Sequence, residues 1–234
     1  MERKMRYAKV IVVAMSLLWA GGATPPAHSQ DVPSRPEEIE WTWEVRPASP
    51  DPKLPNVLLV GDSITRNYYP EVKEQLAGAA NVYLMATSAS VGDQRLLRQL
   101  AEFSSAEAVE FSVVHFNNGM HGWTYSEAEY REQFPSLLSE LRTIAGKAVL
   151  VWATTTPVKE DTLPGPTNAR IDARNSIAQT LVKAAGILVD DQHQLMLGHR
   201  DLYQDPVHFD RRGSAIQGKQ AALVVRGILS HPRR

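Results

Sequence analysis

The sequence has 234 residues, of which 43% are hydrophobic and 22% are charged. This length suits one domain, and the composition is that of a globular protein with a packed core rather than of a disordered or fibrous chain. The formal net charge of -1 gives no excess of Lys and Arg for binding phosphate backbones, so we expect no nucleic-acid partner. The absence of cysteine excludes disulfides, thiolate metal sites and a lipidated cysteine.

The first 29 residues have the layout of a secretory signal. Basic residues precede an apolar run at residues 10–20, and small residues follow it. The run is shorter than the roughly 20 residues that cross a bilayer, which favours cleavage over an uncleaved anchor. We therefore predict a signal peptide over residues 1–29, and a mature protein in the periplasm or secreted, with no stable membrane span.

Residues 30–55 contain six prolines, which suppress regular hydrogen-bonded structure. We expect a linker or a strap over this range. Trp41 and Trp43 are two positions apart and point to the same side if the segment is extended. The alternatives are a strap packed on the domain and an arm that contacts substrate.

From residue 56 onward, short apolar runs alternate with longer amphipathic runs, a pattern that predicts βα units and a parallel sheet. The predicted strands are 56–61, 81–86, 111–117, 147–154 and 186–190. The predicted helices are 66–78, 93–106, 126–145, 168–185 and 213–229. Ser126 and Glu129 form a capping box at the start of the third helix, and Gly146 ends it. Runs such as 57–60 have no polar face, which places their strands inside a sheet covered by helices on both faces.

The first predicted strand ends in Gly61-Asp62-Ser63. Ligands of open parallel sheets lie beyond the carboxyl ends of the strands, so this hydroxyl is a candidate nucleophile. The alternative is that Asp62, Ser63 or Thr65 only caps the helix that follows.

A nucleophilic serine needs a base, most often a histidine oriented by a carboxylate. Among the seven histidines, His208 fits best, because Asp205 lies three positions before it in the loop that precedes the last helix. Asp190 and Asp191, at the end of the fifth strand, are alternative partners for His208. His193 is expected on the surface.

These segments resemble the four sequence blocks of the SGNH/GDSL hydrolases. Gly61-Asp62-Ser63 follows the first strand, Gly92 the second and Asn117 the third, and Asp205 with His208 lies near the carboxyl end. The resemblance spans residues 56 to about 229 and defines a hydrolase domain over 56–234. It implies an α/β fold, a three-layer α/β/α flavodoxin-like sandwich with a five-stranded parallel sheet in the order 2-1-3-4-5. It also implies metal-independent ester hydrolysis through an acyl-serine, with no cofactor.

The resemblance gives each of these residues a role. Ser63 is the nucleophile, His208 its general base and Asp205 the residue that orients His208. The oxyanion donors are the backbone amides of Ser63 and Gly92 and the side-chain amide of Asn117. Such donors stabilise the negative charge that develops on the carbonyl oxygen.

The third block departs from the family pattern, because His115 stands where the family has glycine. Asn118 is therefore an alternative oxyanion donor to Asn117. The segment continues through His121 and Trp123, which brings an imidazole and an indole near the predicted site. His121 either contacts substrate or is a loop residue packed by Trp123.

Asn168 is a further candidate for binding a polar substrate. Together with Trp123 and Trp152 it suits sugar stacking and hydrogen bonding, so the predicted partner is a small-molecule or polysaccharide ester, above all an O-acetylated carbohydrate. A lipid acyl or aryl esterase of the same mechanism and a noncatalytic glycan-binding protein are the alternatives. We expect no metal, because the sequence contains no His-Glu-x-x-His or comparable ligand spacing.

Overall fold

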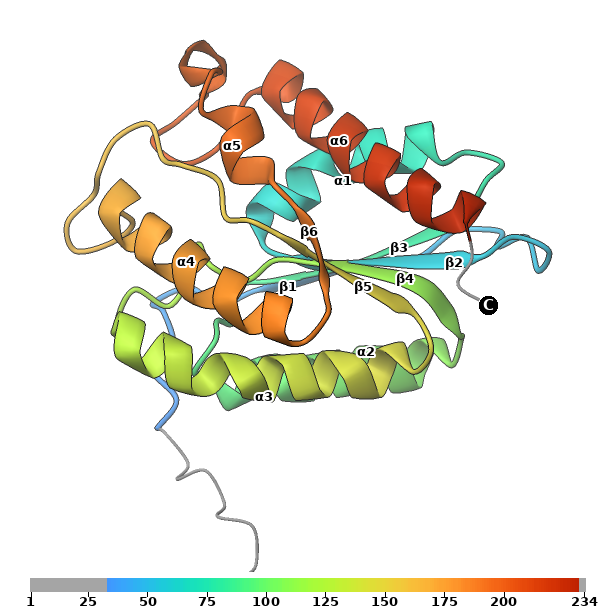
Figure 1. Cartoon of the computed structure of the whole chain (residues 1–234), viewed down its shortest axis with the longest axis horizontal. Helices are drawn as coiled ribbons and strands as arrows, with labels where there is room; N and C mark the ends of the chain where they lie inside the picture. Colours follow the sequence, from blue (N-terminus) through green and yellow to red (C-terminus); the bar gives the residue numbers. More distant parts are fainter. Residues whose placement is uncertain (1–32, 232–234) are drawn as a thin grey trace, which may run out of the picture. The chain divides into compact units, whose positions relative to one another are not determined.

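A computed structural model describes residues 33–231 of the chain (Figure 1). The predicted signal peptide, residues 1–29, lies outside this range. Within residues 33–231 the structure contains no helix that is long and apolar enough to span a membrane.

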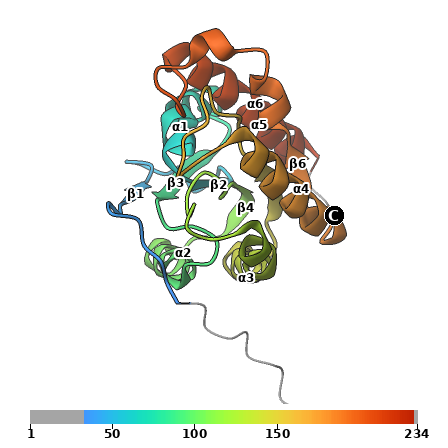
Figure 2. The ribbon, with the colours of Figure 1, turned by 90° about the vertical axis from the view of Figure 1, so that its left-hand side faces the viewer.

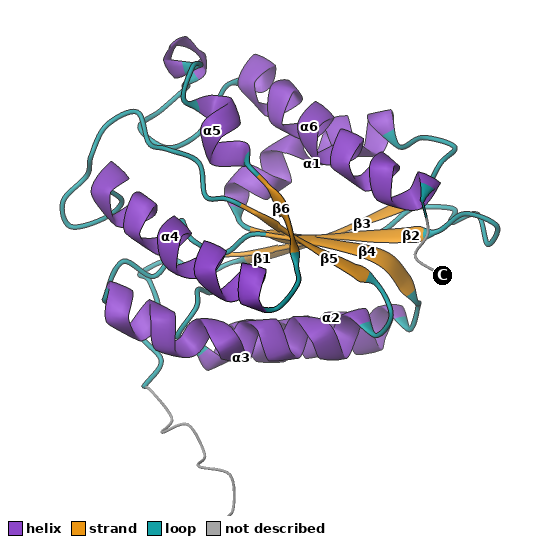
Figure 3. Cartoon of the chain, in the orientation of Figure 1, coloured by secondary structure: helices purple, strands orange, loops and turns teal. Residues whose placement is uncertain are grey.

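The centre of the fold is a mixed six-stranded sheet in the order β1-β3-β2-β4-β5-β6 (Figure 3). Its strands are β1 (Thr42–Val45), β2 (Asn56–Gly61), β3 (Asn81–Thr87), β4 (Phe111–Phe116), β5 (Val149–Ala153) and β6 (Leu188–Asp190). The strands β2 to β6 are parallel and keep the predicted order 2-1-3-4-5. The prediction of a wholly parallel, five-stranded sheet is wrong, because β1 pairs antiparallel with β3.

The extra strand β1 comes from the proline-rich segment 30–55. Its four residues contain no proline and include Thr42, Trp43 and Val45, which are residue types that favour strands. The prolines flank the strand, and an edge strand tolerates proline beyond its ends. The proline content of the whole segment therefore hid a short local strand signal.

The helices form two layers (Figures 1 and 2). They are α1 (Ser63–Gln75), α2 (Gln94–Glu107), α3 (Glu127–Ala145), α4 (Asn168–Ala184), α5 (Gln192–Met196) and α6 (Arg211–Ser230). Strand β2 shows how both layers are held, because Leu58 and Val60 pack against α2 and α3 while Val57 and Leu59 pack against α1 and α6. All four side chains are almost fully buried. Hydrophobic burial on both faces thus stabilises the sandwich.

Local capping chemistry sets where the helices start and stop. The predicted capping box is present, with Ser126 and Glu129 each bonded to the backbone of the other, and α3 ends at Gly146. Helix α1 begins at Ser63, three residues before the predicted start, because Asp62 Oδ1 accepts a hydrogen bond from the Ile64 amide at 2.9 Å. The candidate serine is therefore the first residue of a helix.

Candidate active site

Ser63 lies in a tight turn between β2 and α1, at the carboxyl end of a central strand. A Cβ atom at Gly61 would lie 2.0 Å from Thr65 Oγ1, so glycine is required there for the chain to turn directly into the helix. Asp62, which is 1% exposed, caps the helix, while the Ser63 side chain is half-buried and reaches the surface. The Ser63 amide belongs to the first turn of α1, where backbone amides have no intrahelical acceptor.

Three side chains from the two ends of the domain form a continuous hydrogen-bonded series. Ser63 Oγ lies 2.7 Å from His208 Nε2. The other ring nitrogen, His208 Nδ1, lies 2.9 Å from Asp205 Oδ2 and 3.1 Å from Asp205 Oδ1. When Asp205 is ionised, Nδ1 carries the proton that it donates to the carboxylate, and Nε2 is left to accept the serine proton.

The loop before α6 keeps Asp205 ionised. Partial burial raises the pKa of Asp205, but hydrogen bonds from the backbone amides of His208 and Val207 and the contact with the His208 ring outweigh it. The net result is a pKa of Asp205 below its ordinary value. The same loop that carries the histidine therefore also fixes the charge state of its partner.

The alternative carboxylates have other partners. Asp190 Oδ2 lies 2.9 Å from His115 Nε2, and neither side chain has any exposed surface. Asp191 accepts a hydrogen bond from Thr154 Oγ1 at 3.0 Å and caps α5. Within the part of the chain that the structure describes, Asp205 is the acidic residue in contact with His208.

Gly92 lies in the loop between β3 and α2. Its φ of +99° is a left-handed value, and a Cβ atom there would lie 2.9 Å from the Tyr125 ring. Asn118 braces the same loop, since its Oδ1 accepts from the Val91 amide at 2.8 Å and its Nδ2 donates to Ala89 O at 3.0 Å. The side chain of Asn118 thus holds the loop that carries Gly92.

Asn117 follows β4 and is buried, and its backbone amide donates to Val60 O of β2 at 3.0 Å. Its Nδ2 donates to Ala153 O at 2.7 Å and to Thr155 Oγ1 at 3.0 Å. Both amide hydrogens therefore have acceptors in this structure. The oxyanion role of Asn117 stays a prediction, and it requires this amide to turn away from β5.

His121, in the loop between β4 and α3, pairs with Glu37 of the segment before β1. Its Nδ1 is 2.9 Å from Glu37 Oε2, and its side chain is 18% exposed. Burial lowers the pKa of His121, but the hydrogen bond to Glu37 and the charges of Asp62, Glu37 and Glu40 raise it above the ordinary value. Burial in turn raises the pKa of Glu37, and its bonds to His121 and the Gly122 amide lower it overall.

Two other predicted substrate contacts have structural partners. Trp123 is covered by Arg174 and Arg170, whose guanidinium carbons lie 4.1 and 5.1 Å from its ring centroid. Asn168 accepts from the Val158 amide at 3.0 Å and donates to the Val158 carbonyl at 3.1 Å. The Asn168 side chain thus holds the loop before α4.

The prediction of a surface position for His193 is wrong. The short helix α5 places His193 against the end of β5, where its Nδ1 lies 2.8 Å from the Thr155 carbonyl. Its side chain is 17% exposed. A helix of five residues leaves little periodic pattern in the sequence, so the fold turns this histidine inward without a clear sequence signal.

Arg174 organises the loop between β4 and α3. Its buried guanidinium donates to four backbone carbonyls of this loop at 2.7 to 3.3 Å. The acceptors are Gly119, His121, Gly122 and Tyr125. The loop therefore takes its shape around one buried cation.

The segment before β1 crosses the loops that follow β3 and β4. Ser34 donates to Asp93 Oδ1 at 2.7 Å, and Glu37 accepts from the Gly122 amide at 3.0 Å. Glu40 accepts from Ser88 Oγ at 2.6 Å and pairs with Arg95 at 2.7 Å. These contacts attach residues 34–41 to the same edge of the sheet that carries Ser63.

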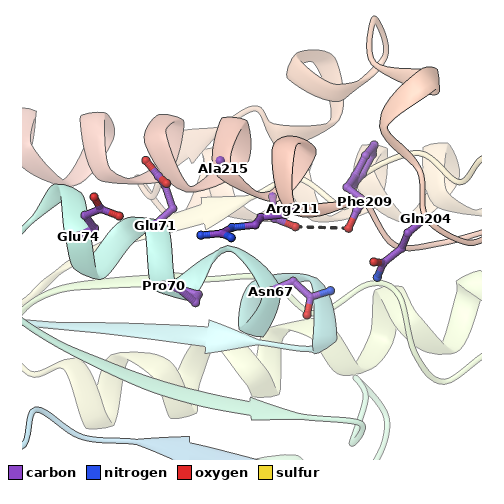
Figure 4. A pocket seen from close by; sticks show the side chains of 9 residues that line it. Asn67, Pro70, Glu71, Glu74, Gln204, Phe209, Arg211 and Ala215 are labelled. Atoms are coloured by element: carbon purple, nitrogen blue, oxygen red, sulfur yellow. Dashed lines mark hydrogen bonds between the residues drawn. The ribbon is translucent and has the colours of Figure 1, made fainter.

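A groove of about 320 Å³ lies between α1 and α6 (Figure 4). Asn67 lies one helical turn after Ser63, and Gln204 and Phe209 flank the Asp205–His208 segment. The lining residues are Asn67, Pro70, Glu71, Glu74, Gln204, Phe209, Arg211, Ser214 and Ala215. A larger groove of about 720 Å³ lies at the opposite edge of the sheet, where β4 and β5 begin, and is remote from the serine.

The fold and the serine turn define the class of protein that this chain is similar to. Its structural neighbours are SGNH/GDSL-like lipases and esterases. A GDSL-like lipase from Bacteroides thetaiotaomicron matches with a TM-score of 0.59 and 16% identity, over 77% of this chain and 92% of that one. A family 3 carbohydrate esterase from Talaromyces cellulolyticus matches with a TM-score of 0.59 and 14% identity, over 77% and 100%.

An acetyl-xylooligosaccharide esterase from Geobacillus is a third neighbour, with a TM-score of 0.58 and 17% identity, over 71% of this chain and 92% of that one. No protein-family model and no curated protein sequence matches the chain. At these identities the shared property is the fold. The chain thus has the fold of SGNH-type esterases.

Proposed function

We propose that the chain is a metal-independent carboxylic ester hydrolase whose nucleophile is Ser63. The observation that carries this proposal is the 2.7 Å contact between Ser63 Oγ and His208 Nε2, with Asp205 on the other ring nitrogen. A serine that only capped a helix would need neither of these partners.

The proposed reaction has two halves. In the first, Ser63 Oγ attacks the ester carbonyl carbon, His208 Nε2 takes the serine proton and then gives it to the departing alcohol, and an acyl-serine remains. In the second, water attacks the acyl group while His208 takes its proton, and the proton returns to Ser63 as the acid leaves. Asp205 stabilises the imidazolium in both halves.

Three donors would stabilise the tetrahedral oxyanion. The backbone amides of Ser63 and Gly92 lie at the ends of neighbouring strands, and the Asn117 side chain supplies the third donor once its amide turns from Ala153 O. Loss of one such donor costs about 100- to 1,000-fold in rate. The turn of Asn117 would accompany substrate binding.

For the substrate we propose O-acetyl groups on a carbohydrate. Six of the nine residues that line the α1–α6 groove are polar or charged, and such side chains can form hydrogen bonds with hydroxyl groups of a sugar. Two of the structural neighbours are a family 3 carbohydrate esterase and an acetyl-xylooligosaccharide esterase. We further propose that the protein is exported to the periplasm or secreted, on the layout of residues 1–29.

Ester turnover tests this proposal. The wild-type protein should hydrolyse p-nitrophenyl acetate, and Ser63→Ala should lower kcat/KM by at least about 1,000-fold. The matched control is Ser139→Ala, which removes an exposed hydroxyl on α3 and should leave the rate unchanged. Equal turnover by Ser63→Ala and wild type would contradict the assigned nucleophile, and no turnover by wild type would favour the noncatalytic glycan-binding alternative.

Acetate release tests the substrate class. Wild-type protein should release acetate from at least one member of a panel of acetylated xylan, pectin, peptidoglycan and sialic acid. Activity confined to esters of longer acyl chains would instead identify a lipid or aryl esterase of the same mechanism.

A further inference from the structure

Two tryptophans and one arginine form a cluster that shares no residue with the α1–α6 groove. The Arg66 guanidinium carbon lies 5.4 Å from the ring centroid of Trp41 and 5.2 Å from that of Trp43. Arg66 follows Ser63 by three positions on α1, so both side chains lie on the same face of the helix. We call Trp41, Trp43 and Arg66 the tryptophan–arginine platform.

The backbone under the platform is fixed. The Trp41 amide donates to Ser88 Oγ at 2.8 Å, and the Ser88 amide donates to Trp41 O at 3.1 Å. Strand β1 places Trp43 directly opposite Ala86, on the strand next to β2. Binding to such a surface costs little ordering of the protein.

The platform keeps an apolar ring in contact with solvent. Trp43 is 52% exposed, which is unusual for an indole that only stabilises a core. Trp41 is half-buried, packs on the α1 face of the core and meets the His121 ring edge-on at 6.0 Å between centroids. Trp41 therefore lies partly in the core, and Trp43 presents its ring to solvent.

The platform also carries a positive charge, the Arg66 guanidinium, that has no carboxylate partner within residues 33–231. Other arginines in or near the segment before β1 have carboxylate partners, Arg35 with Glu129 and Arg95 with Glu40. Within residues 33–231, the Arg66 side chain makes no hydrogen bond and no ion pair. Its guanidinium is thus held over aromatic rings with its N–H donors free for a ligand.

The acidic groups near the platform do not cancel this charge. Glu37 pairs with His121, Glu40 pairs with Arg95, and Asp62 is buried and caps α1. An anionic ligand that reaches Arg66 therefore meets carboxylates that are already paired with cations or buried. Guanidinium groups bind carboxylates through two parallel hydrogen bonds, and exposed indoles bind the apolar faces of ligand rings.

We propose that the tryptophan–arginine platform is a subsite for a sugar that bears a carboxylate, a uronic acid unit, next to the acetylated sugar at Ser63. One ligand of this class satisfies both features, because its ring covers Trp43 and its carboxylate meets Arg66. Three residues of helix span about 4.5 Å, which places the subsite beside the reacting sugar rather than several units away. The substrate class is then an O-acetylated acidic polysaccharide, and this inference rests on the proposed esterase function.

The test measures binding separately from catalysis. In full-length Ser63→Ala protein, titration calorimetry compares an acetylated oligogalacturonate with the same oligosaccharide after its carboxyl groups have been reduced to alcohols. The acidic ligand should bind about tenfold more tightly, the ratio expected for one charge-assisted contact at a partly exposed site. Adding Arg66→Gln should abolish this preference, and adding Arg98→Gln, which removes an exposed charge on α2, should leave it unchanged.

A second variant separates binding from folding. Trp43→Ala in the same background should weaken the acidic and the reduced ligand by similar factors, because both rings lose the same apolar surface. Urea unfolding of each variant shows whether the fold is intact. Equal affinity for the two ligands, or a preference that survives Arg66→Gln, would overturn the proposed subsite.

Measuring ester turnover shows whether the subsite and the esterase activity stand or fail independently. An acidic preference together with no hydrolysis of any ester by wild type would retain the subsite and reject the esterase. Hydrolysis of p-nitrophenyl acetate without an acidic preference would retain the esterase and reject the subsite.

Discussion

Replacing Arg174 by methionine should destabilise the domain and loosen the loop between β4 and α3. Arg174 is 1% exposed and donates to four loop carbonyls, and its guanidinium also lies 4.1 Å from the Trp123 ring centroid. Methionine fills a similar volume and offers no donor. The carbonyls must then turn toward water, which changes the path of the loop.

The expected loss follows from two opposing contributions. A hydrogen bond to a charged group stabilises by about 1.5–3 kcal/mol, so four such bonds would sum to well above the final value. Against this, removing the guanidinium charge from water is itself costly, and the same burial lowers the pKa of Arg174 to about 10. The freed carbonyls also form some hydrogen bonds with water. We therefore expect the free energy of unfolding to fall by about 3 kcal/mol, the contribution of one to two such bonds.

Urea unfolding of wild type and Arg174→Met measures this loss directly. The control is Arg142→Met, an exposed residue with one bond of 3.0 Å to Ala185 O, which should change the free energy of unfolding by less than about 0.5 kcal/mol. A loss below about 1 kcal/mol for Arg174→Met would refute the reasoning, because four charge-assisted bonds would then contribute less than one.

Three further predictions concern the site. Asp205→Asn should lower kcat/KM for p-nitrophenyl acetate by about 100- to 10,000-fold, because an amide does not hold His208 in the tautomer that accepts the serine proton. Gly92→Ala should lower the free energy of unfolding, measured by thermal denaturation, by about 1–3 kcal/mol. The reason is that φ of residue 92 is +99° and the new Cβ would lie 2.9 Å from the Tyr125 ring. Wild type should exceed Glu37→Gln in stability most between pH 4.5 and 6.5. This advantage should fall as pH drops through the lowered pKa of Glu37, where the carboxylate gains a proton, and as pH rises through the raised pKa of His121, where the ring loses one.

Each of these three predictions has a control and a contradicting outcome. An Asp205→Asn rate within threefold of wild type would remove Asp205 from the mechanism. Gly146→Ala has a positive φ without a neighbour within 4 Å, so it should cost less than Gly92→Ala, and the reverse order would contradict the steric reasoning. For the pH profile the control is the exposed Glu38→Gln, and an advantage over Glu37→Gln that is constant from pH 4 to 9 would contradict the ion pair.

The parallel strands could be predicted because their signals are local, whereas their order was implied by the resemblance to the SGNH/GDSL hydrolases. Each buried strand is a short apolar run followed by an amphipathic helix, and residues that follow such strands meet at one edge of the sheet. The sequence does not reveal β1 because its proline-rich context outweighs three residues that favour strands. It does not reveal α5 because five residues are too few to show a helical period. The earlier start of α1 depends on the Asp62 cap, which the apolar pattern alone does not reveal.

The contact of Ser63 with His208 and Asp205 was expected because Ser63 follows a strand and the resemblance to the SGNH/GDSL hydrolases pairs it with the loop before the last helix. The partners of other side chains could not be expected, because they come from segments far apart in the chain. Asp190 binds His115, which is 75 positions away, and Arg174 binds carbonyls about 50 positions before it. Such contacts depend on how the loops pack, and no local pattern encodes them.

The most direct test of the central claim is to locate the reactive serine by covalent labelling. Wild-type protein treated with a fluorophosphonate and digested should carry one phosphonyl group, on the peptide that contains Ser63. Asp205→Asn should label more slowly at the same residue, because the hydroxyl is activated through His208. Labelling of another residue, or equal labelling of Ser63→Ala, would contradict the account.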